Sequence, residues 1–315
     1  MMLSRVAERL YWMARYLERV EDTARLIDAY THVVLDLPQD AEPGWSVLLE
    51  TIEAGAEFDG RFKQAKETSV IRFLISDTET SKSLRHSMRL ARENVRTTRE
   101  ALPAQVWELV NECYLFSEDQ SATSTARKNR SAYLSELVGR LQQINGLIES
   151  SVLRDQPYWY LRLGRLVERA DMTTRIVTAG INTMNQRADD EIAEIPLLWG
   201  NLLRSVSAVS AYRQTVGPLL DPESVISFVL TNAHFPRSLV YCTTALEELV
   251  DTLQAPAGLS RVARLTAARM RRLDVTKVNA GELAEFIDEF QHELSELNAG
   301  FYDAWFSYDM DDAKS

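Results

Sequence analysis

The sequence has few of the residues that cross-link a fold or interrupt helices. Among 315 residues there are 2 cysteines, 12 glycines and 9 prolines. Two widely separated thiols exclude a disulfide scaffold, and we expect Cys113 and Cys242 to be buried side chains that behave as small hydrophobes. With so little glycine and proline, and with long strand-like alternation scarce, the sequence favours helices.

The chain also lacks long apolar runs and an excess of basic residues. It has no stretch of about 20 apolar residues, which excludes a membrane-spanning helix, and Glu8, Arg9 and Arg15 stand where a secretory signal needs an apolar core. We therefore expect a cytoplasmic protein. Lys and Arg number 35 against 46 Asp and Glu, so the net charge is −11. That charge works against non-specific binding to nucleic acid or to an anionic membrane.

Signatures of common catalytic sites are missing as well. The four histidines are scattered, no ligand spacing indicates a metal, and neither a phosphate-binding loop nor a dinucleotide fingerprint is present. We expect no metal and no cofactor. Ser83 and Ser238 could be taken for nucleophiles, but each lies near the start of a predicted helix, where a capping or first-turn role is expected.

The most informative feature is a repeated segment. Residues 12–25, WMARYLERVEDTAR, return as residues 162–175, RLGRLVERADMTTR. Four charged residues recur 150 positions later, namely Arg15, Glu18, Arg19 and Arg25 as Arg165, Glu168, Arg169 and Arg175. Residues 72–95 align without gaps on 227–250, and Leu141, Ile144 and Asn145 match Leu294, Leu297 and Asn298.

Two related helical halves each leave an apolar face that the other can cover. The sequence therefore predicts an all-α, internally duplicated, pseudo-twofold helical bundle. A single domain should span residues 1–308, with halves at about 1–155 and 156–308, followed by a polar tail at 309–315.

Apolar periodicity and helix-breaking residues set the expected elements. We predict helices at about 4–37, 45–54, 63–75, 81–101, 104–116, 132–153, 158–185, 197–215, 223–230, 237–253, 260–273 and 282–306. Pro38 should end the first helix, and the segment GAEFDG should end the second. The polar run at 117–131 predicts a mobile loop.

The repeated charges share one helical face in each copy. In the second copy that face also carries Leu161, Met172 and Ile176, which a solvated face does not need. Ala14 and Gly164 occupy equivalent positions, where a small residue would let another helix come close. Three interpretations stay open. The face is a solvated one with ion pairs of about 0.3 to 0.5 kcal/mol each, a buried structural network, or a ligand pocket.

The pocket interpretation names specific residues. Guanidinium groups bind carboxylate or phosphate bidentately. The candidate ligand-binding residues are Arg15, Arg19, Asp22, Arg25, Arg165, Arg169, Arg175 and Arg237. For Arg237, which lies in a Phe-Pro-Arg-Ser turn, a structural role and ligand contact both stay open. Glu18 and Glu168 would orient the arginines or meet an amine. As catalytic candidates, they would be general bases whose pKa is raised by desolvation.

Four segments carry a resemblance to a known family: LYWMARYLER at 10–19, ARENVR at 91–96, LGRLVERAD at 163–171 and FPRSL at 235–239. They resemble the motifs of the alpha-E family, a bacterial all-helical group named for its Glu-Arg motif. Met13 and Ala14 stand where that family often has Leu and Gly. The resemblance implies a setting beside a circularly permuted ATP-grasp protein and a transglutaminase-like peptidase.

Three functions follow as hypotheses. The first is an accessory or substrate-binding component of an ATP-grasp amide or peptide ligase system, with a peptide or amino acid as ligand. The second is a stand-alone peptide- or aminoacyl-modifying enzyme. The third is a structural assembly module whose ion pairs fix helix register.

Overall fold

The computed structural model describes residues 2–36, 44–185 and 195–307, which form helices and no strand. The prediction of an all-α fold is therefore confirmed. The internal duplication and the division into two halves stay predictions. The helix stop at Pro38 and the polar tail at 309–315 lie outside the described residues.

The described elements follow one another in this order: α1 Ser4–Asp36, α2 Ser46–Thr51, α3 Gly55–Asp59, α4 Glu67–Ser76, α5 Leu84–Arg96, η1 Arg99–Ala101, α6 Ala104–Gln120, η2 Thr123–Thr125, α7 Arg127–Ser151, α8 Gln156–Asn185, α9 Ile195–Ser205, α10 Val209–Thr215, α11 Pro222–Thr231, α12 Leu239–Thr252, α13 Ala257–Arg272, η4 Val275–Lys277, α14 Ala280–Phe301 and the π-helical segment η5 Tyr302–Phe306. None of the described helices combines the length and apolar composition that crossing a bilayer requires.

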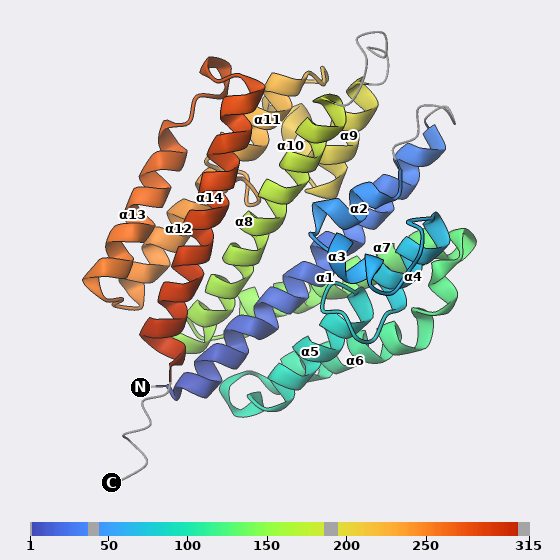
Figure 1. Ribbon diagram of the computed structural model, residues 1–315. Coiled ribbons are helices and arrows are strands. Elements are labelled where there is room, and N and C mark those ends of the chain that lie inside the picture. The colour runs from blue at the N-terminus through green and yellow to red at the C-terminus, as the bar shows by residue number, and fades with distance from the viewer. Residues whose placement is uncertain (1, 37–43, 186–194, 308–315) are drawn as a thin grey trace.

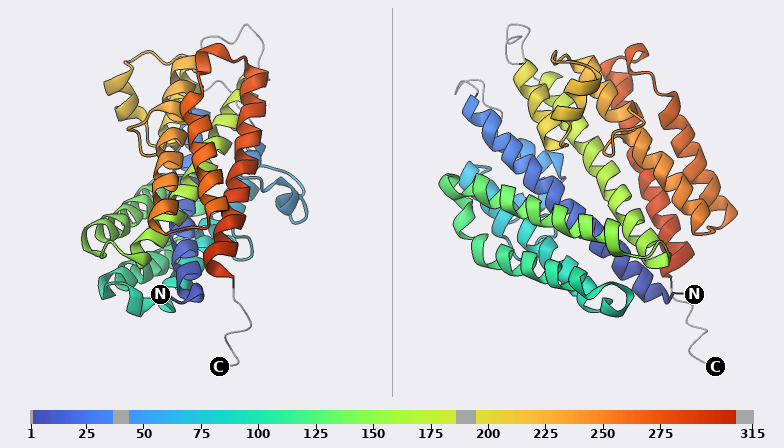
Figure 2. Two further views of the ribbon diagram at one scale, coloured as in Figure 1. Left: turned by 90° about the vertical axis from the view of Figure 1, so that its left-hand side faces the viewer. Right: turned by 180° about the vertical axis from the view of Figure 1, so that it is seen from behind.

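Two long helices, α1 and α8, form the centre of the molecule. They start at the end where the N-terminus lies, run in the same direction and diverge toward the opposite end (Figures 1 and 2). Helices α5 and α7 pack on α1, whereas α12 and α14 pack on α8. Helix α9 contacts both central helices. The repeated charged segments lie on these two helices.

The close approach of α1 and α8 depends on a glycine. A Cβ atom on Gly164 would lie 2.2 Å from the carbonyl oxygen of Tyr11 and 3.3 Å from Cβ of Ala14. Backbone meets backbone here, so no side chain fits on α8 at this level. The expectation that Ala14 and Gly164 let two helices come close is confirmed.

The predicted mobile loop at 117–131 is wrong. Helix α6 continues to Gln120, and α7 begins already at Arg127. The reason is Arg130, a buried residue whose Nη2 donates to Glu67 Oε1 at 2.9 Å and to the carbonyl oxygen of Thr125 at 3.0 Å. These hydrogen bonds hold the polar segment 117–131 against the core.

Two predicted helices are shorter than expected, because each ends at a residue in the left-handed conformation. Glu53 has a φ of 52° after α2, and Ser207 has a φ of 57° after α9. In each case the next amide donates to the carbonyl five residues back, Ala54 to Leu49 at 2.8 Å and Ala208 to Leu203 at 2.7 Å. This is the helix-ending bond of a Schellman motif. The predicted helix 197–215 is therefore split, and GAEFDG starts α3 instead of ending a helix.

The expected roles of the two serines and the two cysteines are confirmed. Ser83 and Ser238 cap α5 and α12, accepting hydrogen bonds from the amides of His86 and Tyr241. Cys113 and Cys242 are buried thiols, and burial raises the pKa of each to about 12.

We predict that Gly164→Ala lowers the free energy of unfolding by about 1 to 3 kcal/mol or more, because the new methyl group overlaps the Tyr11 backbone. Urea denaturation measures the change. The matched control is Gly139→Ala on α7, where nothing lies within 4 Å of the added Cβ. That variant should gain about 0.5 to 1 kcal/mol. Equal stability of Gly164→Ala and the wild type would contradict the close packing.

Candidate functional site

The repeated Glu-Arg motifs pair across the two central helices, and the pairing is reciprocal. Glu168 on α8 accepts hydrogen bonds from Arg15 and Arg19 on α1. Glu18 on α1 accepts from Arg169 on α8. Each helix therefore supplies the carboxylate that holds the arginines of the other.

In the cluster around Glu168, both carboxylate oxygens are used. Arg15 Nε lies 2.7 Å from Oε2, and Arg19 Nη2 lies 2.9 Å from the same oxygen, while Arg19 Nε donates to Oε1. Arg15 Nη1 also donates to Oδ1 of Asn298 at 3.1 Å, and the Tyr11 hydroxyl donates to that oxygen. Helix α14 is thereby joined to the α1–α8 pair.

In the cluster around Glu18, a second arginine enters from outside the motifs. Arg169 Nε and Nη2 lie 2.7 and 3.1 Å from the two Glu18 oxygens. Arg237, from the turn before α12, places Nη1 2.8 Å from Glu18 and donates to Asp22. Its Nη2 donates to Glu21 at 3.1 Å. Arg237 therefore faces three carboxyl groups on one face of α1.

Burial rules out the solvated-face interpretation. Glu18 and Glu168 are each 1% exposed. The side chains of Arg15, Arg19 and Arg169 are 11%, 18% and 14% exposed. A carboxylate buried this deeply is stable only when it is paired and hydrogen-bonded. The motif therefore forms a buried ion-pair network whose arginines still reach solvent.

The expected raised pKa of the two glutamates is wrong. Burial by itself would raise the pKa of Glu168, but the charges of Arg19 and Arg15 outweigh burial and lower it to about 2. Arg169 and Arg237 likewise overcome burial and lower the pKa of Glu18 to about 2. Both groups are therefore ionised at neutral pH.

Asp22 behaves in the opposite way. Burial raises its pKa well above the usual range, and the neighbouring Glu18 and Glu21 act in the same direction against Arg237. Its Oδ2 atom is buried and makes no hydrogen bond within the described part of the chain. Burial thus opposes the charged form of Asp22 more strongly than Arg237 supports it.

Two further candidates form local pairs at matching positions. Arg25 Nη2 lies 2.9 Å from Glu21, and Arg175 Nε lies 2.9 Å from Asp171, each four residues earlier on the same helix. Arg175 Nη1 also lies 2.6 Å from Glu53 Oε1, in the turn after α2.

The four motif arginines pair with three different carboxylates. Arg15 and Arg19 hold Glu168, and Arg169 holds Glu18. Arg165 instead donates to Glu149 at 2.9 Å, near the end of α7. Binding of a ligand by these arginines stays a prediction.

Sequence reasoning missed several partners of the network: Glu21, Glu53, Glu149, Asn298 and Asn145, whose Nδ2 donates to Glu21 Oε2 at 3.3 Å. For Glu21 a signal existed, because it lies four residues before Arg25, the spacing of a helical ion pair. The two asparagines were visible as a matched pair in the repeat. Nothing in the sequence joined Glu53 or Glu149 to an arginine of another helix.

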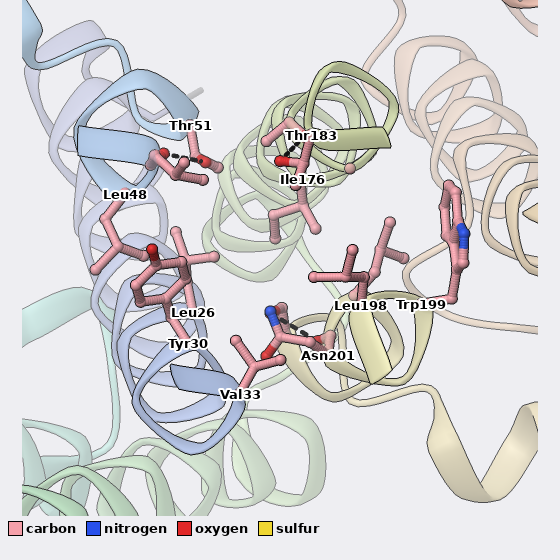
Figure 3. A pocket seen from close by; sticks show the side chains of 15 residues that line it. Leu26, Tyr30, Val33, Leu48, Thr51, Ile176, Thr183, Leu198, Trp199 and Asn201 are labelled. Atoms are coloured by element: carbon pink, nitrogen blue, oxygen red, sulfur yellow. Dashed lines mark hydrogen bonds between the residues drawn. The ribbon is translucent and has the colours of Figure 1, made fainter. Parts of the chain in front are cut away.

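Two adjoining cavities lie where α1 and α8 diverge. The inner one is lined by α1, α2, α8 and α9, among them Leu26, Leu48, Ile176 and Leu198 (Figure 3). The outer one is lined in part by Glu50, Glu53 and Arg175. Among the candidate ligand-binding residues, Arg175 lines the outer cavity, and the others line neither cavity. Across the described residues, no group of three or more His, Cys, Asp or Glu side chains could hold a metal ion.

A model of the Alpha-E family, described as a predicted alpha-helical domain with a conserved ER motif, matches residues 2–306. The uncharacterized protein Mb2597 of Mycobacterium bovis is 26% identical over 317 residues, which cover 95% of this chain and 35% of the relative. The uncharacterized protein Rv2567 of Mycobacterium tuberculosis has the same identity and coverage. The chain thus spans about a third of the length of these relatives. No solved structure matches it.

We predict that Glu168→Gln lowers the free energy of unfolding by about 3 to 5 kcal/mol, because it leaves the buried ends of Arg15 and Arg19 without a counter-charge. The folded-state pKa of Glu168, about 2, lies below the ordinary 4.5. Its stabilisation is therefore complete above about pH 4.5 and is lost as the pH falls through about 2. Chemical denaturation across this pH range measures both effects.

The control is Glu136→Gln, which removes a half-exposed partner of Arg140 on α7. It should change stability by no more than about 0.5 kcal/mol at any pH. If Glu168→Gln were as harmless as this control, the network would have no structural role.

Proposed function

The chain belongs to the Alpha-E family, and we propose that it is an accessory, substrate-binding component of an ATP-grasp amide or peptide ligase system. One observation carries the proposal. The buried glutamates grip arginines whose side chains remain partly exposed. A carboxylate that holds one edge of a guanidinium fixes the direction of the remaining N–H groups.

Arginines oriented in this way suit an anionic substrate. Arg15 and Arg19 both bind Glu168, and guanidinium groups that share one carboxylate can together donate to the carboxylate or phosphate of a ligand. ATP-grasp enzymes form amide bonds through an acyl-phosphate, so their substrates carry such groups. The proposed ligand is the carboxylate of a peptide or an amino acid.

An independent enzyme that uses the motif glutamates as bases has less support. A general base works best when its pKa lies near the operating pH. The arginines around Glu18 and Glu168 lower the pKa of each to about 2, so neither accepts a proton readily at neutral pH. These carboxylates are suited to positioning arginines.

The length of the relatives also supports an accessory role. The chain matches only 35% of each mycobacterial relative, so in those proteins the domain is accompanied by other sequence. We propose as partners a circularly permuted ATP-grasp protein and a transglutaminase-like protein, in the cytoplasm. The buried network also favours a second candidate, a structural assembly module, in which the arginines contact no substrate.

A coupled assay distinguishes the substrate-binding component from the assembly module. We expect a partner ATP-grasp protein supplied with amino acids or short peptides to yield an amide product, detected by mass spectrometry, only when this chain is present. Arg19→Lys keeps the charge beside Glu168 but removes the planar fork, so product formation should fall about tenfold at a temperature where circular dichroism shows that the variant is folded.

Arg140→Lys is the control, because Arg140 pairs with the half-exposed Glu136 on α7, outside the four segments that resemble the family motifs. Its product yield should match the wild type. A product that requires the chain but ignores Arg19→Lys would favour the assembly module. A product formed equally well without the chain would overturn the accessory role.

A further inference from the structure

The cavity between the diverging ends of α1 and α8 adjoins a second cavity that is lined in part by charged residues. The inner cavity has a volume of about 60 Å³ and the outer about 100 Å³. Four residues line both: Val47, Thr51, Ala179 and Thr183. These residues lie between the inner cavity, an apolar chamber, and the outer cavity, its polar entrance.

The chamber is built from side chains of four helices. Leu26 on α1, Leu48 on α2, Ile176 on α8 and Leu198 on α9 surround a common space (Figure 3). Burial of apolar ligand atoms among such groups is favourable at about 25 cal/mol per Å². At roughly 10 to 15 Å³ for each water-sized group, the chamber has room for about four to six such groups. That is the size of a branched aliphatic side chain.

The entrance carries one arginine, Arg175, and two carboxylates, Glu50 and Glu53. Arg175 is fixed by Asp171, at 2.9 Å from Nε, so its guanidinium keeps its place whatever Glu53 does. Its Nη1 lies 2.6 Å from Glu53 Oε1, yet this buried nitrogen makes no hydrogen bond of good geometry within the described residues. Glu53 is mostly exposed and stands on a turn. The contact is therefore an ion pair that a ligand can open.

A fixed guanidinium and a movable carboxylate beside an apolar chamber match the chemistry of one class of molecule. A free α-amino acid presents a carboxylate, an ammonium group and a side chain from a single carbon. The ligand carboxylate can replace Glu53 at Nη1 of Arg175, and the ammonium can pair with the released carboxylate of Glu53. We propose that this composite cavity binds a free L-amino acid with a branched aliphatic side chain, which occupies the chamber.

This site differs from the one in the proposed function. It shares neither Arg15 nor Arg19, and it requires no partner protein. Binding here can be measured on the isolated chain, so its failure leaves the ligase assay untouched, and a failed ligase assay leaves this site untouched.

Two lining atoms could instead select a polar side chain. Asn201 Oδ1 and Trp199 Nε1 are buried and have no hydrogen bond within the described part of the chain. A side-chain amide such as that of glutamine could satisfy Asn201. The apolar groups outnumber these atoms around the chamber, and therefore we assign an aliphatic side chain, which a comparison with glutamine tests.

The experiment is isothermal titration calorimetry of the full chain with L-leucine. We expect saturable binding with one site per chain. The analogue 4-methylpentanoate lacks the ammonium group and isopentylamine lacks the carboxylate, so each should bind at least about tenfold more weakly, one ion pair being lost. Absence of saturable leucine binding at millimolar concentration overturns the proposal, and so does tighter binding of L-glutamine than of L-leucine.

Variants place the ligand in the cavity. Arg175→Gln and Glu53→Gln should each weaken leucine binding about tenfold or more. Ala179→Leu fills the junction of the two cavities and should abolish binding with the melting temperature kept. Ala132→Leu, an equal change at an exposed position of α7, should leave the affinity as in the wild type. Leucine binding that survives both Ala179→Leu and Arg175→Gln would show that the ligand lies elsewhere, which overturns the assignment.

Discussion

The reciprocal grip between two buried glutamates and the arginines of the opposite helix is the constraint on which the structure depends. Glu18 and Glu168 are almost wholly removed from water, and an unpaired charge there would cost several kcal/mol. Each is compensated only if α1 and α8 lie close together and in register. Gly164 permits that approach, because a side chain at its position would strike the Tyr11 backbone. The buried charges and the glycine are therefore both needed for the close packing of α1 and α8.

The two clusters are similar in plan but differ in how they are closed. Arg237 enters the Glu18 cluster and meets Glu21 and Asp22 as well. In the alignment of the two halves Arg237 corresponds to Lys82, whose Nζ donates instead to the Ile52 carbonyl at 2.8 Å, next to the turn that carries Glu53. The Glu18 cluster is closed by Arg237 from the turn before α12, and the Glu168 cluster is closed by Asn298 from α14. Arg175 lies at the edge of a cavity.

The sequence was sufficient for the helical fold and for the approach of the motif helices, because those depend on local patterns. The spacing of Arg25 and Glu21 also indicated a pair within one helix. The sequence could not show that Arg19 binds Glu168 whereas Arg165 binds Glu149. Any of several carboxylates within reach would satisfy an arginine equally well. The cavity was beyond sequence reasoning for a related reason, since its lining comes from four separate helices.

The low pKa of the motif glutamates decides how the chemistry of this domain can be divided. A carboxylate whose pKa is lowered to about 2 by neighbouring arginines stays charged at neutral pH. It therefore serves to orient those arginines and not to transfer protons. The groups able to respond to a ligand lie at the periphery of the network: the outer edges of Arg15 and Arg19, and the Arg175–Glu53 pair. Glu168 and Arg175 lie on the same continuous helix, α8. The buried network thereby fixes the frame against which the peripheral charges can recognise a substrate.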